Sequence, residues 1–193
     1  MERCGWSDSG GELLAKYHDE EWGQPVHDDR KHFEFLVLEA FQAGLSWMTI
    51  LRKRDAFKKA FDSFDPFKVA AYDGAKIEKL LADAGIVRNR LKIVAAINNA
   101  RRFLQVQKEF GSFDNYLWAF VGGKPVKGKW RDWADIPATT DLSDHISADL
   151  KKRGFKFVGS TIVYSHLQAV GVVNDHVTHC FRSQEPPSPA KSR

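Results

Sequence analysis

Apolar residues recur at helical spacing over most of the chain, and this pattern limits the folds that the sequence can adopt. The longest periodic stretch covers residues 90–110, in which Ile93, Ile97, Ala100 and Leu104 fall near one face. Strand-like alternation of polar and apolar residues is scarce. We therefore predict an all-α fold.

Four further segments share the helical spacing. They cover residues 31–44, 76–84, 143–152 and 160–170. The third opens at Ser143, which we expect to be its N-cap. Residues 121–130 are rich in glycine and lysine, and we predict a loop or a short hairpin there. The pattern indicates a single domain over residues 1–182, followed by a polar tail at 183–193 that we expect to be disordered.

Length and composition suit a compact domain that needs no covalent links. The chain has 193 residues, and a hydrophobic content of 43% with 28% charged residues excludes a disordered or low-complexity protein. Two cysteines are too few for a secreted disulfide-rich domain. No apolar run reaches the roughly 18 residues of a membrane span, and the first residues lack the apolar core of a signal peptide. We expect a soluble, cytoplasmic protein without a membrane partner.

The net charge of +4 is small, but basic residues gather in three runs. These runs lie at 52–54, 88–92 and 151–156. Clusters of this kind suit a polyanionic partner, and they are equally compatible with ordinary solvated helix faces. Charge alone therefore leaves the partner open.

Two cysteines and two histidines near the chain ends could form a metal site. Cys4 and His18 lie near the N-terminus, and His176 and Cys180 lie near the C-terminus. The spacing of four between the last two would place both side chains on one face of a helical turn. Two thiolates and two imidazoles fill a tetrahedral structural zinc site. The alternative is a pair of core cysteines with two surface histidines, and spacing alone does not decide between them.

Glu39 is an acid within the apolar stretch 33–47. A buried carboxylate without a partner is costly, so this side chain must face solvent, a partner or a ligand. Phe35, Glu39, Gln42 and Ser46 fall on one helical stripe. Glu39 and Gln42 could therefore present polar atoms from the same wall. The alternative is an ordinary amphipathic helix with Glu34 and Glu39 in water.

Four aromatic residues occur in the same N-terminal quarter of the chain: Trp6, Tyr17, Trp22 and Trp47. Aromatic faces together with one carboxylate suit a flat cationic ring, which they would hold by stacking and by cation–π attraction. The same rings could instead fill the core.

Residues 153–177 resemble the helix-hairpin-helix motif of DNA repair glycosylases. Between two expected helices lies Phe157-Val158-Gly159-Ser160-Thr161. In that motif a glycine-containing turn directs backbone N–H groups toward a phosphate. Further blocks extend the resemblance, namely ERCGW (2–6), YHDEEWG (17–23), QAGLSW (42–47), DAGIVRNRLKI (83–93) and RGFKFVG (153–159). Up to about residue 180, the chain resembles the bacterial 3-methyladenine DNA glycosylase I family.

The resemblance implies a fold, a cofactor and an activity. The fold would be all-α, with two closely packed lobes and the helix-hairpin-helix near 150–171. One structural Zn²⁺ per chain would join the two chain ends through Cys4, His18, His176 and Cys180. The activity would be DNA base-excision repair, in which the N-glycosidic bond of 3-methyladenine in alkylated double-stranded DNA is hydrolysed. We expect a monomer.

The resemblance also assigns roles to individual residues. Glu39 is the candidate catalytic residue, and we expect it mainly to select a cationic adenine by accepting a hydrogen bond from its amine. The substrate-binding residues would be Trp6, Tyr17, Trp22, Gln42 and Trp47. The DNA-binding residues would be Gly44, Leu45, Lys156, Gly159, Ser160 and Thr161. Leu45 is the candidate wedge that fills the gap left by a flipped base, and a core leucine at a helix end is the alternative.

Two positions depart from the wider superfamily. Asn174 stands where the catalytic Asp is usual, and Thr161 stands where bifunctional members carry a Schiff-base Lys. The resemblance therefore implies a monofunctional hydrolase without lyase activity. Asp175 is interpreted as structural, although an exchange of roles between Asn174 and Asp175 stays open.

Two other functions fit parts of the sequence. A zinc-stabilised module that binds damaged DNA without catalysis would need the same pocket and hairpin. A metallohydrolase with a catalytic zinc would need an open coordination position, which two cysteines and two histidines do not leave.

Overall fold

Nearly all regular structure is helical in the computed structural model, which describes residues 2–184. The α-helices are α1 (Gly11–Glu20), α2 (Asp29–Gln42), α3 (Trp47–Ala60), α4 (Pro66–Ala70), α5 (Gly74–Ala82), α6 (Arg90–Phe110), α7 (Phe113–Ala119), α8 (Asp141–Lys152), α9 (Ser160–Ala169) and α10 (Phe181–Gln184). Short 3-10 helices are η1 (Gly5–Gly10), η2 (Asp62–Phe64) and η3 (Trp133–Asp135), and the strands are β1 (Val126–Lys127) and β2 (Val173–Asn174). The prediction of a mostly helical fold is confirmed.

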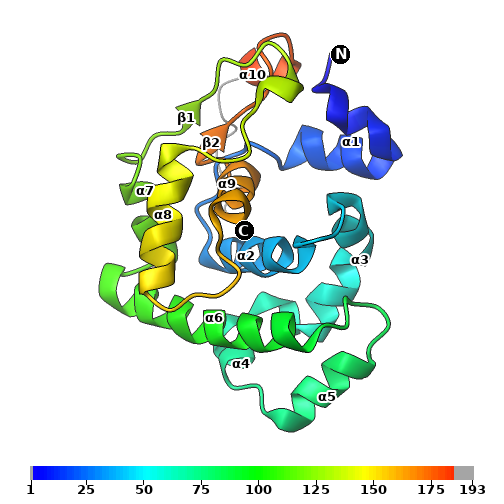
Figure 1. The fold of residues 1–193 in the computed structure, drawn as a ribbon, viewed down its shortest axis with the longest axis vertical. Coiled ribbons are helices and arrows are strands. Elements are labelled where there is room, and N and C mark those ends of the chain that lie inside the picture. Colours follow the sequence, from blue (N-terminus) through cyan, green and yellow to red (C-terminus); the bar gives the residue numbers. More distant parts are fainter. Residues whose placement is uncertain (1, 185–193) are drawn as a thin grey trace.

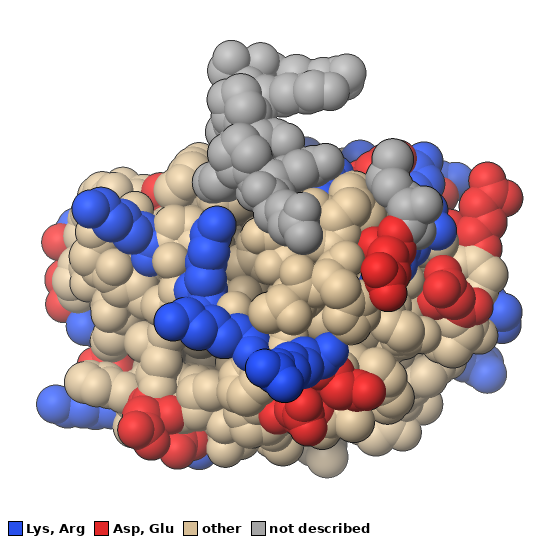
Figure 2. Space-filling view, turned by 90° about the horizontal axis from the view of Figure 1, so that it is seen from above, with Lys and Arg blue, Asp and Glu red and all other residues tan. Residues whose placement is uncertain are grey.

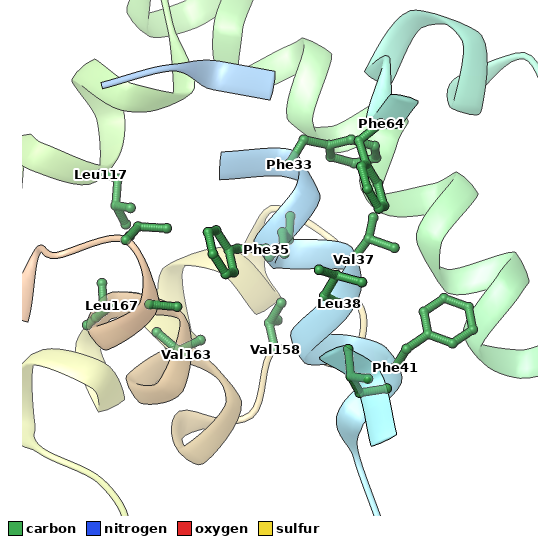
Figure 3. Close-up of a cluster of buried hydrophobic side chains, with 14 of the residues drawn as sticks. Phe33, Phe35, Val37, Leu38, Phe41, Phe64, Leu117, Val158, Val163 and Leu167 are labelled. Atoms are coloured by element: carbon green, nitrogen blue, oxygen red, sulfur yellow. The ribbon is translucent and has the colours of Figure 1, made fainter. Parts of the chain in front are cut away.

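Helix α2 is the central element of the fold. It packs against α3, α6, α7 and α9 (Figure 1). Its side chains from residue 35 to residue 41 are buried all round, as expected for a helix in the interior. Figure 3 shows Phe35 and Phe41 leaving α2 on opposite sides, with Val163 and Leu167 of α9 on the side of Phe35. Glu39 therefore lies in a stretch of α2 whose side chains are all buried.

Capping side chains determine where most helices begin. Helices α2 to α8 each start at a residue whose side chain accepts a backbone N–H of the first turn: Asp28, Ser46, Asp65, Asp73, Asn89, Ser112 and Thr140. Each such cap contributes about 1 kcal/mol. The prediction that Ser143 caps its helix is wrong, because α8 starts two residues earlier and Ser143 completes a capping box with Thr140. Helix α9 differs, because it starts after Gly159, which has no side chain to cap it.

The loop at residues 121–130 is tied to a distant part of the chain. Strand β1 pairs in parallel with β2, with Val126 opposite Val173 and Lys127 opposite Asn174. The predicted loop is therefore present, but the alternative of a local hairpin is wrong. This pairing fixes the segment that leads into His176.

The two ends of the described chain meet at the top of Figure 1. The backbone N–H of Phe181 donates to the carbonyl of Glu2 at 3.1 Å. Helix α10 includes positions 183 and 184, which we had assigned to the tail. The rest of the predicted disordered tail, from residue 185, lies outside the described residues.

Basic and acidic side chains are mixed on the face of the molecule that Figure 2 shows. On the face shown in Figure 2, Lys and Arg side chains form a row, and acidic side chains lie beside them. This mixture agrees with the small net charge of +4. Within residues 2–184, the structure contains no helix whose length and apolar character would let it cross a membrane.

Candidate active site and metal cluster

A pocket of about 350 Å³ opens beside the C-terminal half of α2. Its walls contain all six residues predicted for base binding: Trp6, Tyr17, Trp22, Glu39, Gln42 and Trp47. Pockets for small ligands usually measure roughly 300–1,000 Å³, so this one has room for a flat base. The alternative in which these rings only fill the core is wrong.

Five pocket residues are missing from the sequence prediction: Trp133, Ala134, Ile136, Ser165 and Gln168. The first three lie in and after the short η3 helix, where the sequence has no periodic signal. The last two lie three residues apart on α9 and so share one face. Their spacing could have indicated a common face, but the sequence does not show which other element that face meets.

The pocket rings are held in place by other rings. Trp6 packs edge-on against Trp22, with 5.0 Å between ring centroids. The ring centroids of Tyr17 and Trp47 are 5.4 Å apart. The Trp47 ring is stacked with the Phe35 ring of α2, with 6.5 Å between their centroids. Aromatic pairs in these arrangements stabilise one another. The pocket is therefore formed before any ligand arrives, which lowers the entropic cost of binding.

The Glu39 carboxyl group is buried in the pocket wall, with only 3% of the residue exposed. Its Oε2 has no hydrogen-bond partner within residues 2–184. Burial raises the pKa of Glu39 to about 8. The alternative in which Glu34 and Glu39 are both in water is wrong for Glu39, whereas Glu34 forms ion pairs with Lys31 and Arg54. A cationic ligand would bring a positive charge close to the Glu39 carboxyl group. If it also carried an N–H group, it could donate a hydrogen bond to Oε2.

Ser46 does not share a helical stripe with Glu39, contrary to the prediction. Helix α2 ends at Gln42, and the exposed Ser46 caps α3 by accepting the Thr49 N–H at 3.2 Å. Gln42 does lie in the pocket wall with Glu39. The predicted stripe applies the helical spacing across the break between α2 and α3, where it does not hold.

The break is a type II turn over residues 42–45. Ala43 has φ −44° and ψ 115°, Gly44 has φ +79°, and the Leu45 N–H donates to the Gln42 carbonyl at 2.6 Å. The second central position of such a turn needs a positive φ, which glycine adopts without strain. Leu45 follows with 41% of its surface exposed, so the alternative of a core leucine is wrong.

The four predicted metal ligands come together where the chain ends meet. The ligand atoms of Cys4, His18, His176 and Cys180 all lie within 4.8 Å of one another, and all four residues are buried. The Cys180 Sγ is 3.5 Å from His18 Nε2 and 3.5 Å from His176 Nδ1, and the Cys4 Sγ is 3.6 Å from the same Nδ1. Zinc–sulfur bonds of about 2.3 Å and zinc–nitrogen bonds of about 2.0 Å give tetrahedral S–N edges of about 3.5 Å. The cluster therefore has the donors and the dimensions to hold a metal ion, and the alternative of surface histidines is wrong.

Each of these two histidines uses its other ring nitrogen in a separate contact. His18 Nδ1 lies 2.8 Å from the Asp19 carboxylate, which Arg3 also binds. His176 Nε2 lies 3.0 Å from the Trp22 carbonyl. A neutral imidazole that donates from one nitrogen presents a lone pair on the other. These contacts therefore leave His18 Nε2 and His176 Nδ1 as the atoms that can bind a metal.

Residues 176–180 are not helical, contrary to the prediction. They form a turn in which the Cys180 N–H donates to the Val177 carbonyl at 2.8 Å, and α10 starts only at Phe181. The turn still brings His176 and Cys180 into one cluster. His179, between them, is exposed.

The cluster of Cys4, His18, His176 and Cys180 lies directly behind the pocket. The His176 ring lies 4.6 Å from the Trp22 ring, and the His18 ring lies 5.4 Å from the Trp6 ring. Both tryptophans line the pocket. Two walls of the pocket therefore pack directly against residues of the cluster.

Polar side chains hold the tight turn between α8 and α9. Asn99 of α6 accepts the Lys156 N–H and donates to the Lys156 carbonyl, each at 2.8 Å. Ser147 of α8 donates to the Val158 carbonyl at 2.7 Å. Phe157 has a left-handed φ of +53°. This loop leads directly into α9, which begins after Gly159 without a side-chain cap. In the first helical turn of α9, Ser160 is half-buried and Thr161 is exposed.

Comparison with known proteins identifies the family. The family model for methyladenine glycosylases matches residues 6–183. The chain belongs to this family. It is 50% identical to DNA-3-methyladenine glycosylase 1 of Escherichia coli (strain K12), over 93% of this chain and 96% of the relative. It is 39% identical to DNA-3-methyladenine glycosylase of Haemophilus influenzae, over 92% of this chain and 96% of the relative.

A solved structure extends the comparison to a ligand. It is a point variant of 3-methyladenine DNA glycosylase I in complex with 3-methyladenine, with a TM-score of 0.91 and 36% identity. The match covers 97% of this chain and 100% of that one. The family expected from the sequence motifs is thereby confirmed.

In this member of the methyladenine glycosylase family, Asp175 is fully occupied by internal contacts. Its buried carboxylate accepts hydrogen bonds from Tyr164, Gln168 and Trp130. The neighbouring Asn174 is half-buried, and its side-chain oxygen accepts the His176 N–H at 3.2 Å. These contacts support a structural interpretation of Asp175.

Proposed function

We propose that the protein is a DNA-3-methyladenine glycosylase, which removes 3-methyladenine from alkylated double-stranded DNA in base-excision repair. The observation that carries the proposal is the buried Glu39 carboxyl group in an aromatic pocket of suitable size, with an Oε2 that has no hydrogen-bond partner among the described residues. Two curated relatives have names that state this activity, and a solved relative binds 3-methyladenine. Tyr17 and Trp47 would contact the faces or edges of the flipped base, at about 1–3 kcal/mol for each stacking contact.

The chemistry needs little assistance from the protein. Methylation at N3 gives the adenine ring a positive charge while it is still attached to the sugar. When the bond from N9 to C1′ breaks, its electron pair neutralises the ring, and the base leaves uncharged. Water adds its oxygen to C1′ and loses a proton, which leaves an abasic site. A strong carboxylate beside the sugar is therefore dispensable, which agrees with Asn174 at the position of the usual Asp.

Glu39 would serve mainly to select the base. Only interactions that strengthen in the transition state accelerate the reaction, and a carboxylate that binds the cation also stabilises the ground state. With a pKa of about 8, Glu39 holds a proton at neutral pH in the free protein. A cationic adenine would favour the ionised form, and its amine would donate to the free Oε2. Neutral adenine would offer no such compensation for burying the charge.

The DNA would bind over the turn between α8 and α9 in a helix-hairpin-helix arrangement. The first N–H groups of α9, next to Gly159, Ser160 and Thr161, would hold a phosphate, because a helix N-terminus attracts anions. Lys156 would add a second positive contact. Gly44 lets the chain turn so that the exposed Leu45 can enter the gap left by the flipped base.

The ion held by Cys4, His18, His176 and Cys180 would be zinc, one per chain. Four protein ligands leave no position for a water molecule, so the ion would supply structural stabilisation only. It would hold together the two chain ends and, through them, Trp6 and Trp22. We also predict that the protein is a monomer and that it acts in the cytoplasm.

Incubation with methylated double-stranded DNA tests the proposed function. We expect free 3-methyladenine in the soluble fraction, measured by chromatography, and uncut strands on a denaturing gel until alkali is added. No lyase step is expected, because Thr161 has no amine that could form a Schiff base. Tight binding of methylated DNA without release of the base would contradict the proposal and would indicate a damage-binding module.

A further inference from the structure

Lys92 carries a buried ammonium group that the proposed function does not yet use. The residue lies in the first turn of α6, and only 7% of it is exposed. Its Nζ donates to the carbonyl of Phe41 at 2.9 Å and to the carbonyl of Ala43 at 2.5 Å. Removing an ammonium from water is costly unless hydrogen bonds compensate for it. The two carbonyls that compensate for this charge lie close together at the end of α2.

The Ala43 carbonyl has a special place in the type II turn over residues 42–45. Type I and type II turns differ by a rotation of the peptide plane between their two central residues. Here that plane joins Ala43 to Gly44, and the rotation would point the Ala43 carbonyl away from Lys92. The bond from Lys92 therefore favours the type II form. The second bond, to Phe41 in the last turn of α2, holds the ammonium where the helix dipole also attracts a cation.

The turn controls the position of Leu45. The Leu45 N–H is bonded to Gln42, and Ser46 immediately afterwards begins the cap of α3. The exposed Leu45 side chain thus lies on a short link between two helices. Lys92 reaches this link from a third helix, α6, without lining the pocket.

We propose that Lys92 is a positioning residue that holds the turn over residues 42–45 in its type II form and thereby fixes the Leu45 side chain against the DNA. This inference rests on the proposed function, in which Leu45 fills the gap left by the flipped base. Lys92 itself touches neither base nor sugar. Its effect on excision therefore passes through Leu45.

A double-mutant cycle separates this role from a general contribution to stability. Single-turnover excision from methylated duplex DNA is measured for the wild type, Lys92→Met, Leu45→Ala and the double variant. Methionine keeps most of the lysine side-chain volume but cannot donate. We expect each single variant to be at least about tenfold slower, because small displacements at a reacting site have large effects on rate. The double variant should be no slower than Leu45→Ala, because one residue acts through the other.

Lys53 provides a matched control. Its Nζ also donates to two backbone carbonyls, of Ala84 at 2.9 Å and Gly85 at 3.2 Å, but in a turn that does not line the pocket. Lys53→Met should change the excision rate by less than about twofold. Thermal unfolding of every variant shows whether it is folded. If Lys92→Met does not fold, Lys92→Leu, which likewise cannot donate, replaces it in the same cycle, with the same non-additivity expected.

The outcomes distinguish the inference from the proposed function. If Leu45→Ala is slow while Lys92→Met keeps the wild-type rate, the inference is overturned and the proposed function stands. The inference is also overturned, and the proposed function stands, if the rate losses of the two single variants multiply in the double variant. Two independent structural effects would give that result. If Leu45→Ala excises at the wild-type rate, the wedge itself is wrong, and the role of Lys92 fails with it.

Discussion

Replacing Cys180 by serine should lower the midpoint of thermal unfolding by about 10–20 °C. A structural zinc ion contributes on the order of 10 kcal/mol to the folding of small zinc domains. Loss of even about 5 kcal/mol would shift the midpoint by this amount in a chain of this length. The Cys180 Sγ lies 3.5 Å from both histidine ligand atoms, so no other side chain can take its place without movement. Calorimetry, with metal analysis of the same samples, measures the effect.

His179→Ala is the control for this substitution. His179 is next to Cys180 in sequence but is exposed, so this variant should keep both the metal and the wild-type midpoint. A chelator should destabilise the wild-type protein in the same way as Cys180→Ser, and added zinc should reverse the change. A wild-type protein that contains no metal and loses no stability on Cys180→Ser would contradict the metal site. A chelated protein that keeps its midpoint but loses activity would instead indicate a catalytic ion.

Glu39→Gln should remove a fall in stability that the wild-type protein shows between about pH 5 and pH 8. The pKa of Glu39 is raised from 4.5 to about 8 in the folded protein, so in this range the folded state holds a proton that the unfolded chain has lost. Stability therefore decreases as pH rises, by an amount on the order of 4 kcal/mol once both states are ionised. Glutamine is uncharged at every pH, so the variant should be the more stable protein at pH 8.5. Urea unfolding at pH 5 and pH 8.5 measures the difference.

Glu34→Gln is the matched control on the same helix. The Glu34 carboxylate lies between Lys31 and Arg54 and already has charged partners, so this variant should keep the fall in stability above pH 5. All other titratable groups that affect the curves are common to the wild type and Glu39→Gln, so the difference between these two proteins isolates Glu39. Parallel stability curves for the wild type and Glu39→Gln would show that Glu39 does not retain its proton, and that the pocket is wetter than the structure indicates.

The helices could be predicted where a periodic run is bounded by strong end signals. Residues 90–110 were predicted to be helical and are α6, with Asn89 as the cap and Gly111 directly after its last residue. The start of α8 was misplaced, because Thr140 and Ser143 are both good capping residues and only their mutual contacts decide between them. The predicted stripe from Glu39 to Ser46 was wrong for a related reason. The helical period of 3.6 residues was applied across a turn that in fact ends the helix.

The burial of Glu39 could not be predicted from its own segment. An acid in an apolar helix fits both an amphipathic surface helix and a buried one, and the packing of α3, α6, α7 and α9 around α2 decides the matter. The gathering of Cys4, His18, His176 and Cys180 was predicted with a partly wrong argument, because His176 and Cys180 meet through a turn and not through a helix. Trp133 was missed because the short η3 helix has no periodic signal in the sequence, and only the tertiary fold brings this helix to the pocket.

Binding of a cationic adenine to the pocket is the most direct test of the central claim, that Glu39 in its aromatic pocket selects an alkylated, positively charged adenine. A suitable probe is 3,9-dimethyladeninium, which carries the charge of the alkylated nucleoside but has no glycosidic bond, with neutral 9-methyladenine for comparison. At pH 8 the wild-type protein should bind the cation at least about tenfold more tightly, since hydrogen bonds to charged groups contribute about 1.5–3 kcal/mol. Glu39→Gln should lose most of this preference and keep only the part that cation–π attraction by the rings supplies. Equal binding of the two by the wild type, or a preference that is undiminished in Glu39→Gln, would contradict the claim.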